Sequence, residues 1–218
     1  MESKKITAIL ISYKRVDNLK KIVNSLIQSQ LVGEIIIFNN NKYLDLNKYI
    51  QSLNSETIKV INSNFNFLCV ARYSICMLAK YENIFFQDDD LLFSINNLNH
   101  LYEKFKEDEN RICGYRGRNL ISNKYEAKDV FGEVDIILGQ AMLFNKKLLS
   151  EVYGQILNLT PFDRGDDIAF SLLLKRKHLA IKMDVIDLST DDNFSLWRIP
   201  GHLEKRQAMV NRLAHING

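Results

Sequence analysis

The segment from Asn83 to Leu92 constrains the fold more than any other part of the chain, because a short, largely apolar run there ends in three consecutive carboxylates. Residues 83–86 are too few for a helix and are typical of a short buried strand. Asp88, Asp89 and Asp90 follow almost directly. Two carboxylates about 4 Å apart repel by roughly 4 kcal/mol near a protein surface. Three of them therefore need a compensating cation, or they must splay outward into solvent.

A divalent cation held by these carboxylates is the first interpretation. Hard oxygen ligands suit Mg²⁺ and Mn²⁺, which usually keep one or two protein carboxylates and complete their coordination with water and substrate phosphates. We therefore predict a Mn²⁺ (or Mg²⁺) ion that bridges a diphosphate at the end of a central strand. An acidic turn with solvated Asp side chains is the simpler alternative.

The composition fits one ordinary globular domain over residues 1–218, since 46% of the residues are hydrophobic. A net charge of +3 is too small to indicate a nucleic-acid partner. The basic clusters Lys20–Lys21 and Lys175–Lys177 would allow contact with an anionic membrane, or they are simply solvated helix faces. No apolar run approaches a membrane span and no signal peptide is evident, so we expect a cytoplasmic protein, at most peripheral to the membrane.

Strands and helices alternate in the first half of the chain. We expect strands at residues 5–12, 34–38, 58–61 and 83–86, with helices at 17–28, 44–53 and 67–80 between them. The alternation predicts a parallel sheet with helices on both faces. Ligands of such sheets bind at the carboxyl ends of the strands, where Ser12, Asn39, the Asp cluster and Arg116 are expected to lie.

The second half is more mixed. We expect helices at residues 94–107, 145–152, 166–177 and 201–215, strands at 111–115, 134–144 and 180–185, and polar loops between them. Gly139 interrupts the strand at 134–144, where a side chain would obstruct a closely approaching ligand or backbone. The first half therefore has the pattern of a nucleotide-binding unit, and the second that of a unit that handles an acceptor.

Short motifs in a fixed order run through most of the chain. They are Ile11–Arg15, Asn39–Asn40, Asp88–Asp90, Gly114–Arg118, Leu138–Gly139 ahead of Phe144–Lys147, Gly165–Ala169, and Leu196–Arg198 followed by His202 and Arg206. This ordered set resembles the exostosin-like glycosyltransferase domain (family 64), which has the GT-A fold. The resemblance implies a single α/β domain with a mixed central sheet. It would comprise a Rossmann-like nucleotide-sugar-binding half, about residues 1–92, and an acceptor-binding half, about residues 93–218.

The resemblance also implies a function. The enzyme would transfer a hexosyl or N-acetylhexosaminyl group from a UDP-sugar to a glycan or a lipid-linked (glycolipid) acceptor, in polysaccharide biosynthesis. Mn²⁺ or Mg²⁺ would be its cofactor, acting as a Lewis acid on the departing UDP. Transfer would retain the anomeric configuration of the donor.

On the donor side, the resemblance assigns roles to residues at the carboxyl edge of the sheet. Asp88 would contact the ribose and share the metal with Asp90. His202 lies four residues before Arg206, hence on the same helix face, and would close over the diphosphate near the metal. Solvated helix faces are the alternative for this pair. The nucleotide-sugar contacts would comprise Ser12, Tyr13, Arg15, Asn39, Asn40, Arg72, Asp88, Asp89, Arg118 and Arg206.

On the acceptor side, Asp166 and Asp167 match carboxylates of the family. We expect Asp167 to orient the acceptor hydroxyl or to stabilise positive charge at the sugar carbon, while Asp166 caps the helix. Gly139 and Trp197 would contact the acceptor, although packing is the commoner fate of a single Trp. If Asp167 is a base, inversion is expected; if it only supports the sugar, retention follows.

Three other functions remain as alternatives. An inverting glycosyltransferase similar to family 2 would share the nucleotide-binding half. A nucleotidyltransferase would need a Gly-rich phosphate loop after the first strand, and residues 12–15 contain no glycine. A non-catalytic nucleotide-sugar-binding module would not need carboxylates in both acidic clusters.

Overall fold

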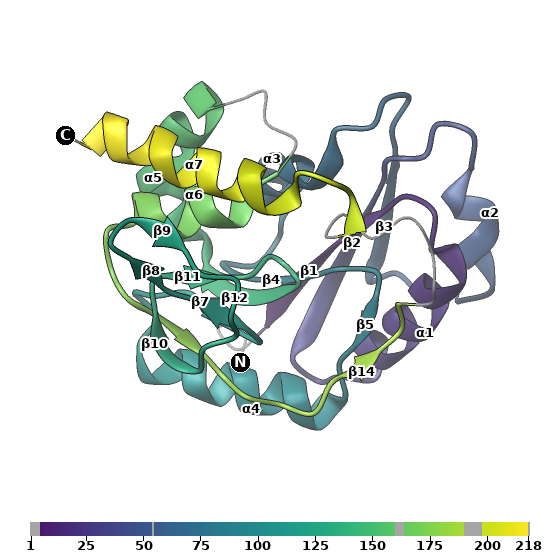
Figure 1. Cartoon of the computed structure of the whole chain (residues 1–218). Coiled ribbons are helices and arrows are strands. Elements are labelled where there is room, and N and C mark those ends of the chain that lie inside the picture. Colours follow the sequence, from purple (N-terminus) through teal and green to yellow (C-terminus); the bar gives the residue numbers. More distant parts are fainter. Residues whose placement is uncertain (1–4, 54, 160–163, 190–197, 218) are drawn as a thin grey trace.

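An eight-stranded sheet in the order β10-β13-β6-β12-β4-β1-β2-β3 forms the centre of the molecule (Figure 1). The computed structural model describes residues 5–53, 55–159, 164–189 and 198–217. The α/β class, the mixed central sheet and the single domain are confirmed. The sheet strands are β1 (Ile6–Ser12), β2 (Val32–Asn39), β3 (Ile58–Asn62), β4 (Asn83–Gln87), β6 (Cys113–Gly114), β10 (Gly132–Val134), β12 (Ala141–Asn145) and β13 (His178–Ala180).

The first four strands run parallel to one another. β1 pairs with β2 and with β4, and β2 pairs with β3, all in parallel register. Parallel neighbours need a crossover connection, and α1 (Val16–Ile27) and α2 (Leu46–Ile50) supply the first two. The register pairs Ser12 with Asn39 and Leu10 with Gln87, so β1, β2 and β4 end at the same edge of the sheet.

Beyond β4 the sheet becomes mixed. β12 is antiparallel to both β4 and β6, β13 runs parallel to β6, and β10 is antiparallel to β13. Within the described residues, three two-stranded ribbons flank the main sheet. They are β5 (Leu91–Leu92) with β14 (Ile186–Asp187), β7 (Gly117–Arg118) with β11 (Ile136–Ile137), and β8 (Leu120–Ile121) with β9 (Lys124–Tyr125).

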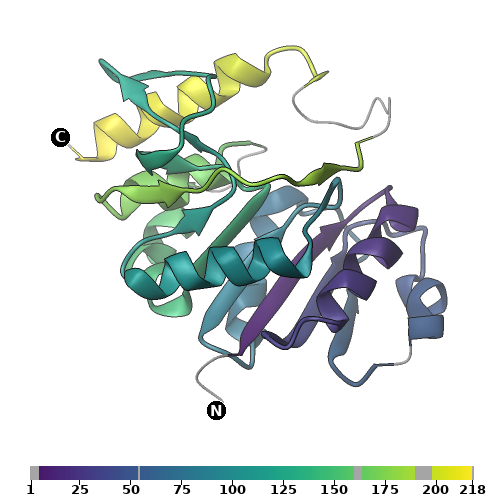
Figure 2. The ribbon, with the colours of Figure 1, turned by 90° about the horizontal axis from the view of Figure 1, so that it is seen from below.

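Helices cover both faces of the sheet, because the central strands are apolar on both sides. In β4, Phe85 packs with one hydrophobic cluster while Ile84 and Phe86 pack with the other. The Phe85 side is covered by α1, α2 and α4 (Ile95–Glu107); Figure 2 shows α1 and α4 along this face. The other side is covered by α3 (Ala71–Ile75), α5 (Lys146–Leu159), α6 (Asp166–Leu173) and α7 (His202–Asn217).

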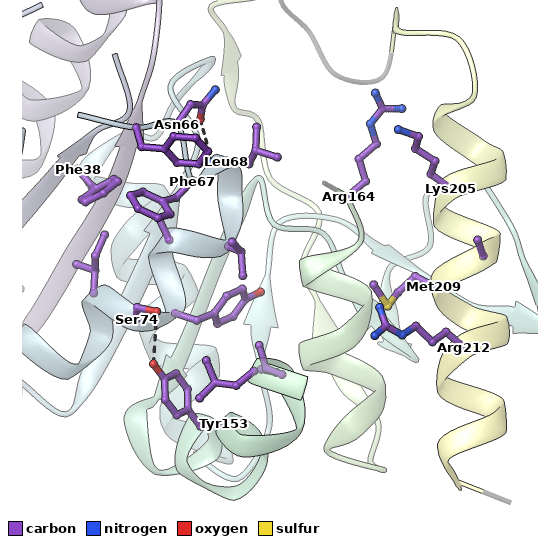
Figure 3. Close-up of a pocket in the computed structure, with 18 residues that line it drawn as sticks. Phe38, Asn66, Phe67, Leu68, Ser74, Tyr153, Arg164, Lys205, Met209 and Arg212 are labelled. Atoms are coloured by element: carbon purple, nitrogen blue, oxygen red, sulfur yellow. Dashed lines mark hydrogen bonds between the residues drawn. The ribbon is translucent and has the colours of Figure 1, made fainter. Parts of the chain in front are cut away.

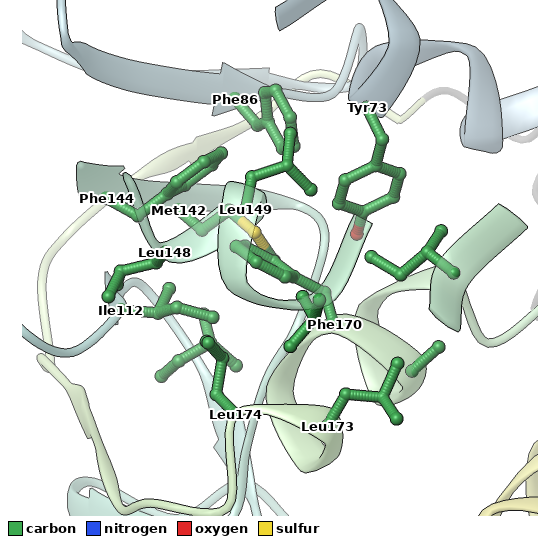
Figure 4. Packing of buried hydrophobic residues seen from close by; sticks show 14 of the residues in the cluster. Tyr73, Phe86, Ile112, Met142, Phe144, Leu148, Leu149, Phe170, Leu173 and Leu174 are labelled. Carbon is green, nitrogen blue, oxygen red and sulfur yellow. The ribbon is translucent and has the colours of Figure 1, made fainter. Parts of the chain in front are cut away.

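Four aromatic rings tie the elements on this second side together. Tyr73 of α3 contacts Phe86 of β4 and Phe170 of α6, with ring centroids 5.5 and 5.4 Å apart. Phe144 of β12 closes the group, 5.0 Å from Phe86 and 4.9 Å from Phe170. All four pairs are close to edge-to-face, the arrangement that aromatic rings prefer (Figure 4). The packing fixes α3 and α6 relative to the end of β4.

His178, at the start of β13, is a buried neutral histidine. Its Nδ1 accepts a hydrogen bond from the Ile112 N–H (3.3 Å), and its Nε2 lies 3.0 Å from the Ser171 carbonyl oxygen. Only the neutral ring with its proton on Nε2 satisfies both partners. Burial lowers the pKa of His178 to about 4.

Several elements differ from the expectation. The helix expected at 67–80 is broken into 3-10 turns at Leu68–Val70 and Cys76–Leu78 around the five-residue α3. Leu68 has a positive φ of 58°, which a helix does not accept. The strand expected at 134–144 is divided among β10, β11 and β12. The helix expected at 166–177 ends at Leu173, shortly before the left-handed residue Lys175 (φ 52°). None of the described helices is long and apolar enough to cross a membrane.

Candidate active site

The three carboxylates that follow β4 lie at the carboxyl edge of the parallel strands, as the sequence predicts. The Asp88 N–H donates to the Gln140 carbonyl oxygen (2.8 Å), which fixes the backbone at the start of the cluster. Arg15, directly before α1, pairs with Asp89 at 2.8 Å and with Asp90 at 3.2 Å. The cluster therefore faces a guanidinium from the loop that follows β1.

Arg72 connects this cluster to the second half of the chain. Its side chain is 3% exposed, and its Nη2 lies 2.9 Å from Asp88 while its Nε lies 3.7 Å from Asp166. It also donates to the carbonyl oxygens of Cys69 (3.1 Å) and Gly139 (2.6 Å). A buried guanidinium with this many partners is held in one position. The two acidic clusters, far apart in sequence, therefore meet at Arg72.

Asp167 is fully engaged by protein donors. Arg206 of α7 forms a two-pronged ion pair with it, at 3.1 Å to Oδ1 and 3.0 Å to Oδ2. The Ile168 N–H also donates to Oδ1 (2.9 Å), and the Gly139 N–H donates to Oδ2 (3.1 Å). The Arg206 guanidinium in turn lies 4.7 Å from the centroid of the Tyr125 ring. Asp167 thus joins α6, α7 and the β11–β12 connection.

Asp166 differs from its neighbour. It is 9% exposed, and its Oδ2, the atom 3.7 Å from Arg72, accepts no hydrogen bond from the part of the chain that the structure describes. Asp90 has a similar atom, since its buried Oδ1 accepts none from those residues either. One oxygen in each acidic cluster therefore remains able to accept a hydrogen bond or ligate an ion.

The charges of the site respond to burial and to the arginines. Burial raises the pKa of Asp166 to about 6, although the Arg72 charge opposes the shift. The same balance raises the pKa of Asp88 to about 6, even with its side chain 30% exposed, and burial raises the pKa of Asp90 as well. Burial also acts on Asp167, but the charge and hydrogen bonds of Arg206 outweigh it and lower the pKa of that carboxyl. Burial is therefore the largest cause of the raised pKa values in the site, and the arginines oppose it.

Gly139 leaves little space for a side chain, because other side chains of the protein pack closely against it. A Cβ at this position would lie 3.2 Å from Arg72 Nη1 and 3.5 Å from the Asp167 Cβ. The sequence predicts a close approach by a ligand or a backbone, and the approaching group in the structure is a guanidinium. Contact of Gly139 with an acceptor stays a prediction.

The residues expected around the nucleotide base are near the same edge, but their polar groups mostly serve the fold. The buried Asn39 amide donates to the Leu44 carbonyl oxygen (2.6 Å) and to the Asn62 side chain (2.9 Å). The buried Asn40 amide holds the loop before α3, through the Leu68 carbonyl oxygen (3.1 Å) and the Phe67 N–H (3.0 Å).

Ser12 and Tyr13, at the end of β1, differ in exposure. The Ser12 Oγ is buried and makes no hydrogen bond within the described residues. Tyr13 is 40% exposed and carries Lys14 over its ring. Tyr13 therefore offers an exposed aromatic surface, whereas the Ser12 hydroxyl is enclosed by the protein.

The roles of three further expected residues stay predictions. Arg118 pairs with Asp129 and donates to the Gly117 carbonyl oxygen (3.0 Å). His202 begins α7 and is partly buried. Trp197 lies outside the described residues, so its role stays a prediction.

Sequence reasoning missed two residues that support the cluster. The Asn18 amide donates to the carbonyl oxygens of Asp89 and Leu188, both at 3.1 Å. The Leu188 N–H donates to the Asp90 carbonyl oxygen (2.7 Å), beside the β5–β14 ribbon. An Asn on a helix surface gives no local signal of such a contact. The pairing of β5 with β14 could be found only from the folded chain.

The carboxylates fit a divalent metal that takes a small part of its coordination from protein. Within the described residues no group of three or more His, Cys, Asp or Glu side chains is placed to hold an ion. Asp88 and Asp90 still supply hard oxygen donors, and the buried Asp90 Oδ1 is not used by a hydrogen bond from those residues. One or two carboxylates are the usual protein share for Mg²⁺, the rest coming from water and phosphate.

An open sheet with charged side chains at the carboxyl edge of its parallel strands defines a protein that binds its ligand at that edge. The glycosyl transferase family 64 domain model matches residues 6–218. The chain therefore belongs to glycosyltransferase family 64, the exostosin-like family, and it is a glycosyltransferase. This confirms the resemblance indicated by the ordered motifs. No curated protein matches the chain.

Proposed function

We propose that this glycosyltransferase uses a UDP-sugar and Mn²⁺ or Mg²⁺, and that it transfers the sugar with retention to a glycan or a lipid-linked acceptor. The observation that carries the proposal is the meeting of two acidic clusters at Arg72, at the end of β4. A donor bound at that edge would have Asp88 and Asp90 at its diphosphate. Asp166 and Asp167 would lie on the side of the transferred sugar.

The arginines and the carboxylates beside the diphosphate would have different roles in binding it. Arg15 and Arg72 are cations within ion-pair distance of the cluster, and each can shift a donor N–H from a carboxylate to a phosphate oxygen. Asp88 and Asp90 would hold the divalent ion, which offsets the charge on the departing nucleoside diphosphate.

The hydrogen bonds of Asp167 favour retention. Both of its oxygens already accept two N–H groups each, and Arg206 lowers its pKa, so it is a weak base with no oxygen left for an acceptor hydroxyl. Its negative charge can still stabilise positive charge that develops at the sugar carbon. With Asp167 in this supporting role, the reaction would retain the anomeric configuration of the donor.

An inverting reaction with Asp166 as the base is the second candidate. Asp166 keeps one oxygen without a hydrogen bond from the described residues, and its pKa is raised to about 6, closer to the range suited to proton transfer. Assignment of the product anomer by NMR separates the two. An inverted product would assign the base role to Asp166 and would end the proposal of retention.

The donor and the metal are tested by release of UDP from a panel of UDP-sugars, with Mn²⁺, with Mg²⁺ and with EDTA. We expect one UDP-sugar to give metal-dependent release of UDP by the wild-type protein. Asp90→Asn should release no more UDP with Mn²⁺ or Mg²⁺ than with EDTA. Asp184→Asn is the matched control, because it removes the same charge from an exposed position that belongs to neither acidic cluster. Equal release with EDTA and with metal would exclude the metal role. Release from none of the UDP-sugars would exclude the donor class.

A further inference from the structure

A large apolar pocket lies beside the carboxylate site, between α3 and the helices α5 and α7. Its volume is about 950 Å³, at the upper end of the range of roughly 300–1,000 Å³ for small-molecule pockets. Apolar and aromatic side chains make up most of the lining, among them Phe38, Phe67 and Met209 (Figure 3). Tyr153 and Ser74 add one hydrogen bond, at 3.4 Å.

The mouth of the pocket exposes further apolar surface. Phe65 is 62% exposed, and Phe67 and Leu157 are each 48% exposed. Phe65 and Phe67 also contact each other, with ring centroids 5.1 Å apart. Contiguous exposed apolar side chains at the edge of a cavity are typical of a surface that is covered by a ligand.

The charged side chains of the pocket all have one sign. Arg164, Lys205 and Arg212 line it, and no Asp or Glu does so among the described residues. Arg212 is held by the carbonyl oxygens of Leu159 (2.7 Å) and Asn158 (3.3 Å) at the end of α5. Figure 3 shows Arg164 and Lys205 on one side of the pocket, across from Phe38 and Phe67. The pocket therefore combines an apolar interior with cationic groups at its border.

The buried side chain of Arg164 independently indicates that this pocket binds an anionic group. It is 9% exposed, and its Nε and Nη1 atoms are buried and donate no hydrogen bond within the part of the chain that the structure describes. Burying a guanidinium is costly unless an anion or hydrogen-bond acceptors compensate it. The groups that bind phosphate best are guanidinium N–H donors of this kind.

The position of Arg164 links the pocket to the site. Arg164 lies two residues before Asp166, so their Cα atoms are within about 8 Å of each other. On the other wall, Tyr73 and Ala71 line the pocket while Arg72 between them contacts Asp88. A ligand with a phosphate at Arg164 would therefore have the groups attached to that phosphate close to the carboxylates.

We infer that this pocket binds the lipid part of a lipid-phosphate-linked acceptor, with its hydrocarbon chain on the apolar walls and its phosphate at Arg164 and Lys205. The inference rests on the proposed function, because it names the class of acceptor used by the same site. A lipid phosphate accounts for both the apolar surface and the Arg164 donors that have no acceptor within the described residues. A free sugar chain would use neither.

Binding of dodecyl phosphate, at concentrations below its micelle threshold, tests the inference by calorimetry without any donor. We expect saturable binding to the wild-type protein and a loss of affinity of roughly tenfold or more in Arg164→Gln. Lys205→Gln provides a second variant should Arg164→Gln unfold. Lys182→Gln is the matched control, since it removes a cation from an exposed position outside the pocket. Thermal unfolding of each variant shows whether it is folded.

Three comparison ligands decide the outcome. Dodecyltrimethylammonium, with the same chain and the opposite charge, should bind at least tenfold more weakly, and inorganic phosphate alone should not compete. Equal affinity for both amphiphiles, equal binding by the wild type and both pocket variants, or full competition by inorganic phosphate would each overturn the inference. Displacement of dodecyl phosphate by a hydrophobic peptide without a phosphate group would also overturn the inference and would indicate a protein partner.

The two proposals can fail separately. If metal-dependent UDP release is found but dodecyl phosphate does not bind, only the lipid acceptor is refuted. If dodecyl phosphate binds as expected but no UDP-sugar is used, the donor assignment is refuted and the pocket remains a lipid-phosphate site.

Discussion

Breaking the buried pair of Asp167 and Arg206 should destabilise the protein far more than breaking an ordinary ion pair. The two residues are 5% and 7% exposed, so Arg206→Met would leave a carboxylate in the interior with two backbone donors and no cation. Removing one partner of a buried pair costs roughly 3–5 kcal/mol. In a chain of this size 1 kcal/mol shifts the melting temperature by roughly 2–4 °C, so we expect a decrease of roughly 6–20 °C.

The double variant Asp167→Asn/Arg206→Met isolates the pair. The double variant should lose less free energy of unfolding than the two single variants lose together, by roughly 2–3 kcal/mol, because the second substitution removes the buried charge that the first leaves without a partner. Urea unfolding of the four proteins at pH 7 measures this. Arg176 and Glu151 are the matched control, an ion pair whose side chains are 34% and 35% exposed, where the same cycle should give less than about 1 kcal/mol. If the losses of unfolding free energy in the two single variants add up to the loss in the double variant to within about 0.5 kcal/mol, the reasoning is refuted.

Two other predictions concern the core and the site. Because burial lowers the pKa of His178 to about 4 from an unfolded value near 6.5, the unfolded state binds the extra proton between these values, and stability should fall by roughly 3 kcal/mol as the pH drops through that window. His178→Gln should remove this part of the pH dependence of urea unfolding; an unchanged slope would contradict it. Gly139→Ala should reduce kcat about tenfold, because its Cβ displaces Arg72, whereas Gly154→Ala, whose Cβ has no neighbour within 4 Å, should leave kcat unchanged. Equal kcat in the two alanine variants would exclude the displacement.

Much of the first half could be predicted because its signals are local. The apolar run at residues 83–86 and the carboxylates after it placed β4 and the acidic edge correctly. Ser94 caps α4 through the Asn97 N–H (3.0 Å), as an N-terminal Ser before a helical pattern predicts. The helix expected at 67–80 was wrong in extent, because its apolar spacing does not reveal that Leu68 has a left-handed backbone.

The roles within the site could not be separated from sequence alone. Asp166 and Asp167 are adjacent and chemically identical, and only the position of Arg206 on α7 decides which of them is saturated. Likewise, Arg72 is one cation in an apolar segment, and its two acidic partners come from different halves of the chain. Such differences arise from contacts between distant segments, which spacing does not encode.

The pairing of β5 with β14 has a consequence for biosynthesis. Residues 91–92 leave the ribosome early, but their strand partner at 186–187 emerges only when most of the second half has been made. Contacts of such long sequence separation form late and slowly. A nascent or prematurely terminated chain that already carries all three Asp residues would therefore still lack the segment whose Leu188 N–H holds the Asp90 carbonyl oxygen, and the complete site should form only near the completion of translation.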